Sequence, residues 1–298
     1  MRTMALIAAD TFTACRRGAV LWVVLGLAAV GVTAVMVTVA NVPRSLMAAA
    51  AGLVESGEIP ELSIDPDAAR RGEKADAAVG LDDETYALVM QDTARDATFR
   101  YVIGTGGMLL AILMGVFVNE TRSARIQTVI ARPIRRSHVA LGQLAGGLGV
   151  VILGLAMMSL CHYAMTAAVG RVSCPRCFLA AAAILPNLLV AAAMAYALAT
   201  ATHVLVATGV AVLLSTSFTT LGSVTEYLSR AGVDGVIARA VGAAHAVLPR
   251  FLEVRRAGED LLFGESLPGG YGVAIAVDVV YLVLFVAISC RVFGRREV

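Results

Sequence analysis

Residues 177–225 read CFLAAAAILPNLLVAAAMAYALATATHVLVATGVAVLLSTSFTTLGSVT, a run of 49 residues without a Lys, Arg, Asp or Glu. A helix of about 20 apolar residues crosses about 30 Å of hydrocarbon, so this run is too long for a single crossing. It predicts two membrane-spanning helices joined by a short turn, and His203 lies where that turn is expected.

The composition of the whole chain agrees with that stretch. Of 298 residues, 58% are hydrophobic and 15% are charged, whereas ordinary soluble domains are about 45–50% apolar and about 25% charged. This composition excludes a soluble globular enzyme and also a disordered chain. The 24 basic and 22 acidic residues leave a net charge of +2, which predicts no nucleic-acid partner.

Four further charge-poor stretches bring the expected number of crossings to six, so the expected fold class is an all-α integral membrane protein. The predicted spans cover residues 18–42, 101–119, 139–169, 178–199, 204–225 and 271–292. The remaining segments are an amphipathic interfacial helix (1–17), an acidic outer loop (43–100), a basic loop (120–138), a short outer loop with a CxxC pair (170–177), an outer segment (226–270) and a tail (293–298). No cleavable signal peptide is expected, because the first apolar run is too long for one.

The distribution of basic residues predicts the orientation, since Lys and Arg collect on the cytoplasmic side. The amino end, the basic loop and the carboxyl end from Arg291 onward together carry eleven basic residues, whereas residues 44–96 carry twelve acidic residues against five basic ones. We therefore expect both termini and the basic loop to face the cytoplasm.

Glycines recur at the start of the third predicted span, where Gly142 and Gly146 stand four residues apart. Small residues let helix backbones approach closely in lipid. The pattern fits either a seam between two copies of the chain or close packing within one bundle.

The basic loop and its flanks, residues 117–143, read FVNETRSARIQTVIARPIRRSHVALGQ. They predict a short helix with Ile126, Val129 and Ile130 on its apolar face, ended by Pro133 and followed by a basic cluster. Such a helix can dock into a groove on a soluble partner while its arginines pair with carboxylates or lipid phosphates. A basic loop that only sets the topology would explain the same residues.

This segment resembles the coupling segment of ABC-2 type transporter permeases, whose pattern is E…G…LL…P-[IV]-S-R…LGK. The matching residues are Glu120, Val129, Ile130, Pro133, Ile134, Arg136, Leu141 and Gly142. Ala124, Arg135 and Gln143 depart from the pattern, which has Gly, Ser and Lys there. The interfacial amino-terminal helix, the large loop after the first span, the six spans and the Arg-rich tail are also similar to this family.

The resemblance implies a permease subunit, expected to be an exporter, in a bacterial cytoplasmic membrane, where it contacts lipids and forms a homodimer or heterodimer. A separate ABC ATPase chain would bind ATP and Mg, and this chain would be neither an enzyme nor a cofactor carrier. The chain itself also has no GxxxxGK[ST] phosphate-binding pattern, and Lys74 is its only lysine. The residues implied in coupling are Glu120, Arg125, Ile126, Val129, Ile130, Pro133 and Arg136.

Asp278 is a single acid within the last apolar stretch. A charged acid at the bilayer centre costs about 2.5–3.5 kcal/mol, so its side chain should face the bundle interior. It can belong to a transport or proton pathway together with Ser217 and Thr219. Alternatively, it makes an interhelical hydrogen bond to the hydroxyl run at residues 215–220.

Soft metal ligands mark the third predicted span and the loop after it. Four such residues share a helical face at i, i+3, i+4 and i+7, and a CxxC pair follows them; the residues are Met158, Cys161, His162, Met165, Cys174 and Cys177. Such side chains suit Cu(I), and the pair fits half a zinc site or a disulfide. Met and Cys are also ordinary core residues, so we predict no metal site. A Cu- or Zn-handling membrane protein and a membrane anchor or assembly protein are the alternative functions.

Overall fold

The computed structural model describes residues 2–17, 22, 26, 30, 95–120, 136–170, 174–232 and 235–295. Nearly all of them are helical, and none of these described residues forms a strand. The all-α fold class is therefore confirmed for this part of the chain. The predicted acidic outer loop falls outside it, apart from the helical residues that follow 94.

Five of the described helical stretches are long and apolar enough to cross a membrane. They are Arg95–Val118, Ser137–Ala164, Arg176–Ala201, Val204–Arg230 and Tyr271–Phe293. Their length and composition are compatible with a multi-pass membrane protein. The predicted span at 18–42 lies outside the described residues, apart from three isolated helical positions, so a sixth crossing stays a prediction.

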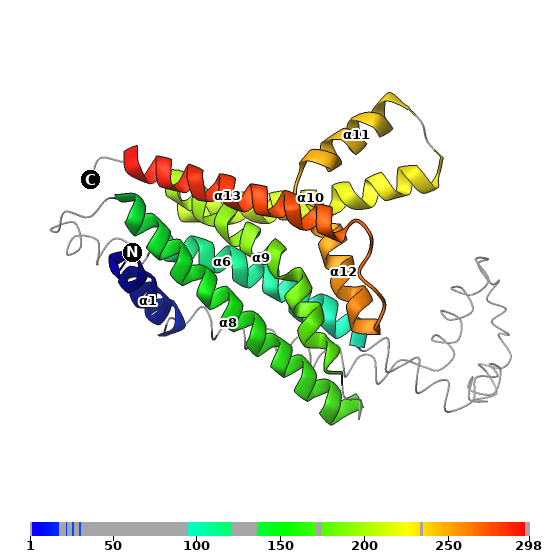
Figure 1. Cartoon of the computed structure of the whole chain (residues 1–298), viewed down its shortest axis with the longest axis horizontal. Coiled ribbons are helices and arrows are strands. Elements are labelled where there is room, and N and C mark those ends of the chain that lie inside the picture. The colour runs from blue at the N-terminus through cyan, green and yellow to red at the C-terminus, as the bar shows by residue number, and fades with distance from the viewer. Residues whose placement is uncertain are drawn as a thin grey trace, which may run out of the picture.

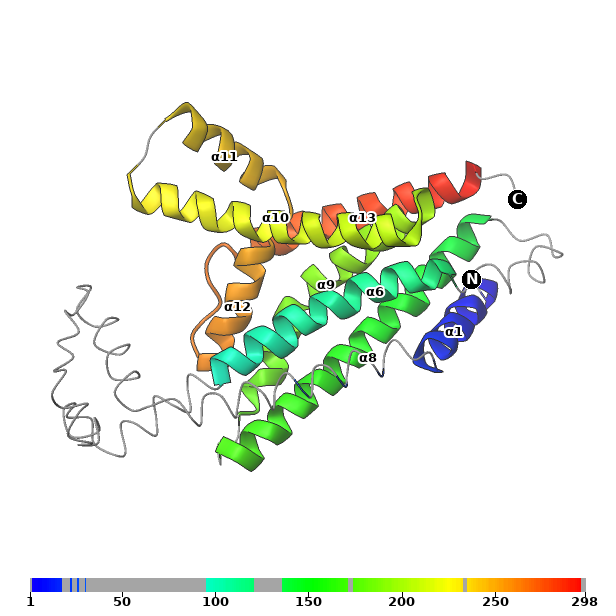
Figure 2. The ribbon, with the colours of Figure 1, turned by 180° about the vertical axis from the view of Figure 1, so that it is seen from behind.

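The helices run as an elongated bundle with two distinct ends (Figure 1). In chain order they are α1 (Arg2–Arg17), the π-helix η2 (Phe99–Gly106), α6 (Gly107–Glu120), α8 (Arg136–Gly170), α9 (Arg176–Ala201), α10 (Val204–Arg230), α11 (Val236–Val247), α12 (Phe251–Phe263) and α13 (Tyr271–Arg295). Figures 1 and 2 show α1, the start of α8 and the carboxyl end of α13 at one end, here called the α1 end. The short helices α11 and α12 lie toward the opposite end, here called the α12 end.

Helix α9 is the centre of the bundle and packs against α6, α8, α10, α12 and α13. Its sequence is rich in alanine, and most of its residues are buried. These small side chains let the neighbouring backbones come close. The tightest approach is at Gly115 of α6, where an added Cβ atom would lie only 2.3 Å from the carbonyl oxygen of Ala192.

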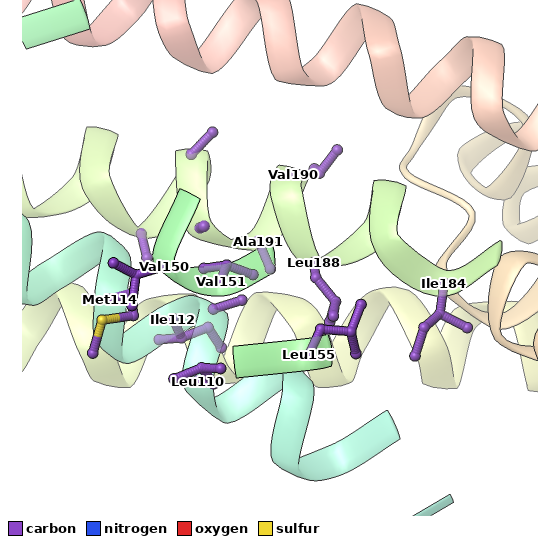
Figure 3. Close-up of a cluster of buried hydrophobic side chains, with 14 of the residues drawn as sticks. Leu110, Ile112, Met114, Val150, Val151, Leu155, Ile184, Leu188, Val190 and Ala191 are labelled. Carbon is purple, nitrogen blue, oxygen red and sulfur yellow. The ribbon is translucent and has the colours of Figure 1, made fainter. Parts of the chain in front are cut away.

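Larger apolar side chains fill the space between α6, α8 and α9, and Val190 points from α9 toward α13 (Figure 3). The labelled members of this core from the three helices are Leu110, Ile112, Met114, Val150, Val151, Leu155, Ile184, Leu188, Val190 and Ala191. Each is at most 5% exposed. This core fixes α6 and α8 against the central helix.

The glycines at the start of α8 form the contact with α1. A Cβ atom added at Gly146 would lie 2.6 Å from the carbonyl oxygen of Ala8, and one added at Gly142 would lie 2.8 Å from Cβ of Ile7. These glycines therefore serve close packing between two helices of one chain, as in the second interpretation of the pattern, rather than requiring a second copy. The position of α1 at a membrane surface stays a prediction.

Helices α10 and α13 are much less covered than α9. Over the most apolar stretch of 18 residues in each helix, only 17% is buried in α10 and in α13, compared with 67% in α9. Helix α10 also continues to Arg230, beyond the end predicted at residue 225, and an i,i+4 ion pair between Glu226 and Arg230 stabilises this last turn. Two faces of the bundle thus present mainly apolar side chains outward.

Replacing Gly115 with Ala should lower the free energy of unfolding by about 1–3 kcal/mol, because the new methyl group would overlap a backbone carbonyl that has no room to move. Thermal or denaturant unfolding of the purified protein in detergent measures this change. Gly209→Ala is the matched control, since no atom lies within 4 Å of a Cβ there. Equal effects of the two substitutions would contradict the tight contact between α6 and α9.

Candidate functional site

A cavity of about 400 Å³ lies between η2, α6, α9, α10 and α12. Its volume falls within the range of about 300–1,000 Å³ that is typical of small-molecule sites. Most of its lining is apolar, including Leu188 and Phe251, and the polar lining residues are Thr105, Asn187, Ser215, Thr216, Thr219 and Arg255. This cavity, here called the pocket, is the candidate functional site.

Asn187 lies one residue after Pro186 in the middle of α9 and is 3% exposed. Its Nδ2 donates to the carbonyl oxygen of Phe251 at 2.9 Å, whereas its Oδ1 has no hydrogen-bond partner. Because a carbonyl can only accept, this contact fixes which side of the amide faces α12. The acceptor Oδ1 is the side left unpaired.

Pro186 removes one backbone bond from the middle of α9. Proline has no N–H, so the carbonyl four residues earlier, that of Ala182, loses its usual partner. Tyr271 of α13 donates its hydroxyl to the neighbouring carbonyl oxygen, that of Ala183, at 2.9 Å. Other helices commonly supply such partners around prolines within membranes.

Ser215 differs from every other Ser and Thr of α10. Those residues donate their hydroxyl to a backbone carbonyl one turn earlier, as Thr216 does to Val212 at 2.9 Å and Thr219 to Ser215 at 3.0 Å. Ser215 is 5% exposed, and its Oγ has no partner. A buried hydroxyl of the pocket is thus free to bond to something else.

The π-helix η2 forms the outer wall of the pocket with Gly104 and Thr105. Its hydrogen bonds connect residues five apart, and the Thr105 hydroxyl likewise donates to the carbonyl oxygen of Arg100 at 3.3 Å. π-helices are rare overall, but those that occur often lie at functional sites. Sequence periodicity did not reveal this one, although three glycines within residues 104–107 mark the segment.

Helix α12 is held against α9 at both ends and in its middle. The Asn187 amide binds its first residue, and Arg176 Nη1 lies 3.5 Å from the carbonyl oxygen of Phe263 at its last. Between them, a Cβ added at Gly258 would lie 2.7 Å from the side chain of Ile184. Gly264 then ends the helix with a φ of +87°, a conformation that favours glycine.

Ion pairs fix the charged groups beside the pocket. Glu259 of α12 accepts from Arg255 at 3.0 Å and from Arg100 of η2 at 3.2 Å. Glu226 of α10 pairs with Arg256 of α12. The one cation that lines the pocket, Arg255, is therefore already paired, and the lining contains no carboxylate.

Asp278 does not line the pocket but is buried in α13, with 1% of its surface exposed. Neither carboxyl oxygen makes a hydrogen bond of normal geometry, and the Arg250 backbone and the Glu253 carboxylate lie near it. The expected bond to the hydroxyl run of α10 is wrong, because those hydroxyls donate to their own helix and Ser215 stays unpaired. Ser217 is exposed and Thr219 lines the pocket, so the three predicted pathway residues do not form one site.

The candidate metal ligands of α8 differ in their exposure. Met158 and His162 are fully buried, Cys161 is exposed, and Met165 lies in α8. His162 packs its ring edge against Phe99, with the ring centres 6.3 Å apart. Within the described ranges, no three His, Cys, Asp or Glu residues are placed to share a metal ion.

The two cysteines of the CxxC pair are buried at the start of α9, and both are free thiols. Cys177 Sγ lies 3.8 Å from the carbonyl oxygen of Ser159. Cys15 in α1 is buried as well, and desolvation raises the pKa of its thiol to about 11. The Cys15 thiol therefore stays protonated and unreactive at neutral pH.

The predicted coupling residues lie at a boundary of the described structure. Glu120 ends α6 and Arg136 begins α8. The other five fall outside the described residues: Arg125, Ile126, Val129, Ile130 and Pro133.

Comparisons of the chain with models of known families, with curated proteins and with solved structures each found no match.

Replacing Asp278 with Asn should raise the free energy of unfolding by about 1 kcal/mol or more, because a neutral amide costs less to bury than an unpaired carboxylate. Thermal unfolding in detergent measures the effect. The control, Glu265→Gln, removes an exposed carboxylate and should change stability by less than about 0.5 kcal/mol. A lower unfolding midpoint for Asp278→Asn would reveal a stabilising partner of the carboxylate and overturn this expectation.

Proposed function

We propose that this chain is the permease subunit of an ATP-driven transporter of the ABC-2 type, powered by a separate ATPase chain. The observation that carries the proposal is the match of residues 117–143 to the coupling segment of that family. The bundle of apolar helices and the pocket between them support a role in moving a molecule across a membrane.

The ends of α6 and α8 support the coupling role. Both helix ends belong to the α1 end of the bundle, where the amino-terminal helix and the carboxyl end of α13 also lie (Figure 2). Sequence analysis predicts that this end faces the cytoplasm, because its segments carry an excess of arginine. An ATPase in the cytoplasm would then meet the segment between Glu120 and Arg136.

Helix α6 offers a direct route from that segment to the pocket. It ends at Glu120, and its first two turns contribute Met108 and Ile112 to the pocket lining. The helix is continuous between these points and packs tightly on α9 and α8, so a displacement at its end moves the pocket wall. ATP binding would shift the equilibrium between two conformations of the permease. The size of that shift is limited by how much better the ATP-bound ATPase binds one conformation than the other.

The partners of the proposed subunit follow from the same family resemblance. ATP and Mg would be bound by the ATPase chain, and two permeases, identical or different, would form the complete pathway. The weakly covered helices α10 and α13 supply apolar surface for the second permease and for lipid. Export is the expected direction of transport.

Replacing both Ile130 and Arg136 with Asp should abolish stimulation of the ATPase by the permease. The first substitution removes an apolar contact of the coupling segment, and the second reverses one of its positive charges. The measurement is ATP hydrolysis by the co-expressed and co-purified ATPase, with and without the permease in lipid discs. Yield and gel-filtration profile of the variant permease show that it still inserts and folds.

The matched control is Arg239→Asp, which reverses an exposed arginine on α11 near the opposite end of the bundle. It should leave ATPase stimulation unchanged. Full stimulation by the double variant, or the lack of any P-loop ATPase that binds the permease, would overturn the proposed function.

A further inference from the structure

We infer that the pocket binds a neutral, mainly apolar molecule that carries a hydroxyl or amide N–H group. The inference that this molecule is the transported substrate rests on the proposed function, whereas the inference that the pocket binds it does not. Four features carry the inference: an unpaired acceptor, an unpaired hydroxyl, an apolar lining and the pairing of the charges beside it.

The unpaired acceptor is Oδ1 of Asn187. The bond from Nδ2 to Phe251 holds the amide in one orientation, so Oδ1 cannot be exchanged for a donor by flipping the group. A buried acceptor without a partner is costly in a protein interior. The molecule that fills the pocket therefore has to bring a hydrogen-bond donor.

The unpaired hydroxyl is that of Ser215 on the facing helix α10. A serine in a helix normally donates to a carbonyl one turn earlier, as its neighbours in α10 do. Ser215 Oγ is buried and makes no such bond. It can donate to the same molecule or accept from it, and a hydroxyl group on the ligand can serve in both roles.

Many other buried polar groups of the bundle are paired, and the described exceptions outside the pocket are His162, Asp278 and Nε of Arg250. Tyr196 donates to Gln143 at 3.2 Å, and Thr200 donates to the carbonyl oxygen of Ala197 at 2.6 Å. Most buried polar groups in proteins are paired in this way. Asn187 and Ser215, which carry these two unpaired atoms, both line the same pocket.

The remaining lining determines the rest of the ligand. Its apolar side chains come from α6, α9, α10 and α12, and they favour a hydrocarbon body. Arg255 is held by Glu259, which Arg100 also contacts, so an anionic ligand finds no unpaired cation in the lining. An ionised ligand would lose its hydration without a matching charge, so a neutral molecule fits best.

The test compares three probes of equal chain length that carry a photoactivatable diazirine: a ten-carbon alcohol, its methyl ether and the corresponding carboxylate. The purified full chain in phosphatidylcholine discs is labelled with each probe, and the modified residues are mapped by mass spectrometry. The alcohol should label pocket residues such as Met108 and Leu188 with an apparent affinity about tenfold higher than the ether, which has no donor. The carboxylate should label weakest.

Two substitutions test the polar atoms separately. Asn187→Leu should reduce the preference for the alcohol over the ether, because only Ser215 is then left to accept from the alcohol, and Ser215→Ala should weaken alcohol labelling by about threefold or more. Ser217→Ala is the matched control, because this exposed hydroxyl of the same helix is bonded to its own backbone. Ser215→Ala removes no hydrogen bond of the bundle, so it tests the inference even if Asn187→Leu does not fold.

The source of the ligand is read from a competition experiment. Diacylglycerol included in the discs should compete with the alcohol if the ligand is a membrane lipid. If the ligand is a soluble amphiphile, an unlabelled alcohol supplied from water should compete with the labelled alcohol, whereas diacylglycerol should not. Competition of either kind supports the pocket as a site for hydroxyl-bearing apolar molecules.

Equal labelling by alcohol and ether in the unchanged protein would overturn the inference, as would labelling confined to residues outside the pocket lining. No ATPase is present in these measurements. A negative result therefore leaves the proposed function standing, and failure of ATPase coupling leaves the pocket's ligand class standing.

Discussion

Close contact between small residues along α9 is the constraint on which the rest of the bundle depends. Lipid tails are as apolar as leucine, so helices in a membrane gain little from burying large apolar groups against each other. Contacts such as Gly115 against Ala192 and Gly258 against Ile184 instead bring α6 and α12 onto the central helix. Once both helices lie there, the pocket between them and α10 is defined.

Among the described residues, the bundle pairs most of its buried polar groups and leaves a few unpaired in three places. The first is the pocket, with Asn187 and Ser215, and the second is the surroundings of Asp278 near the start of α12. The third is His162 of α8, whose two ring nitrogens have no partner. Proteins commonly accept a loss of stability where function needs such groups. The first place fits ligand binding, and the second lies on a helix that packs against the same central helix.

The helical class and the apolar helices could be predicted from sequence, because stretches without charge have to be helical to satisfy their backbone in lipid. The pocket could not, because it depends on how four separate helices meet. The apolar pattern around Asn187 did not predict a role for it, although a polar residue directly after a proline within an apolar helix is a usable signal. The hydroxyl partner expected for Asp278 was wrong, because helix hydroxyls bond to their own backbone first.

The π-helix η2 accommodates a change in the length of its segment. A π-turn holds about one residue more than an α-turn, so deleting one residue between 101 and 106 would let the helix continue in α geometry. Arg100 would then keep nearly the same orientation relative to α6, and its ion pair with Glu259 could persist. The same deletion within α6 would instead rotate the preceding residues by about 100°. Single-residue deletions are therefore less disruptive in η2 than in α6.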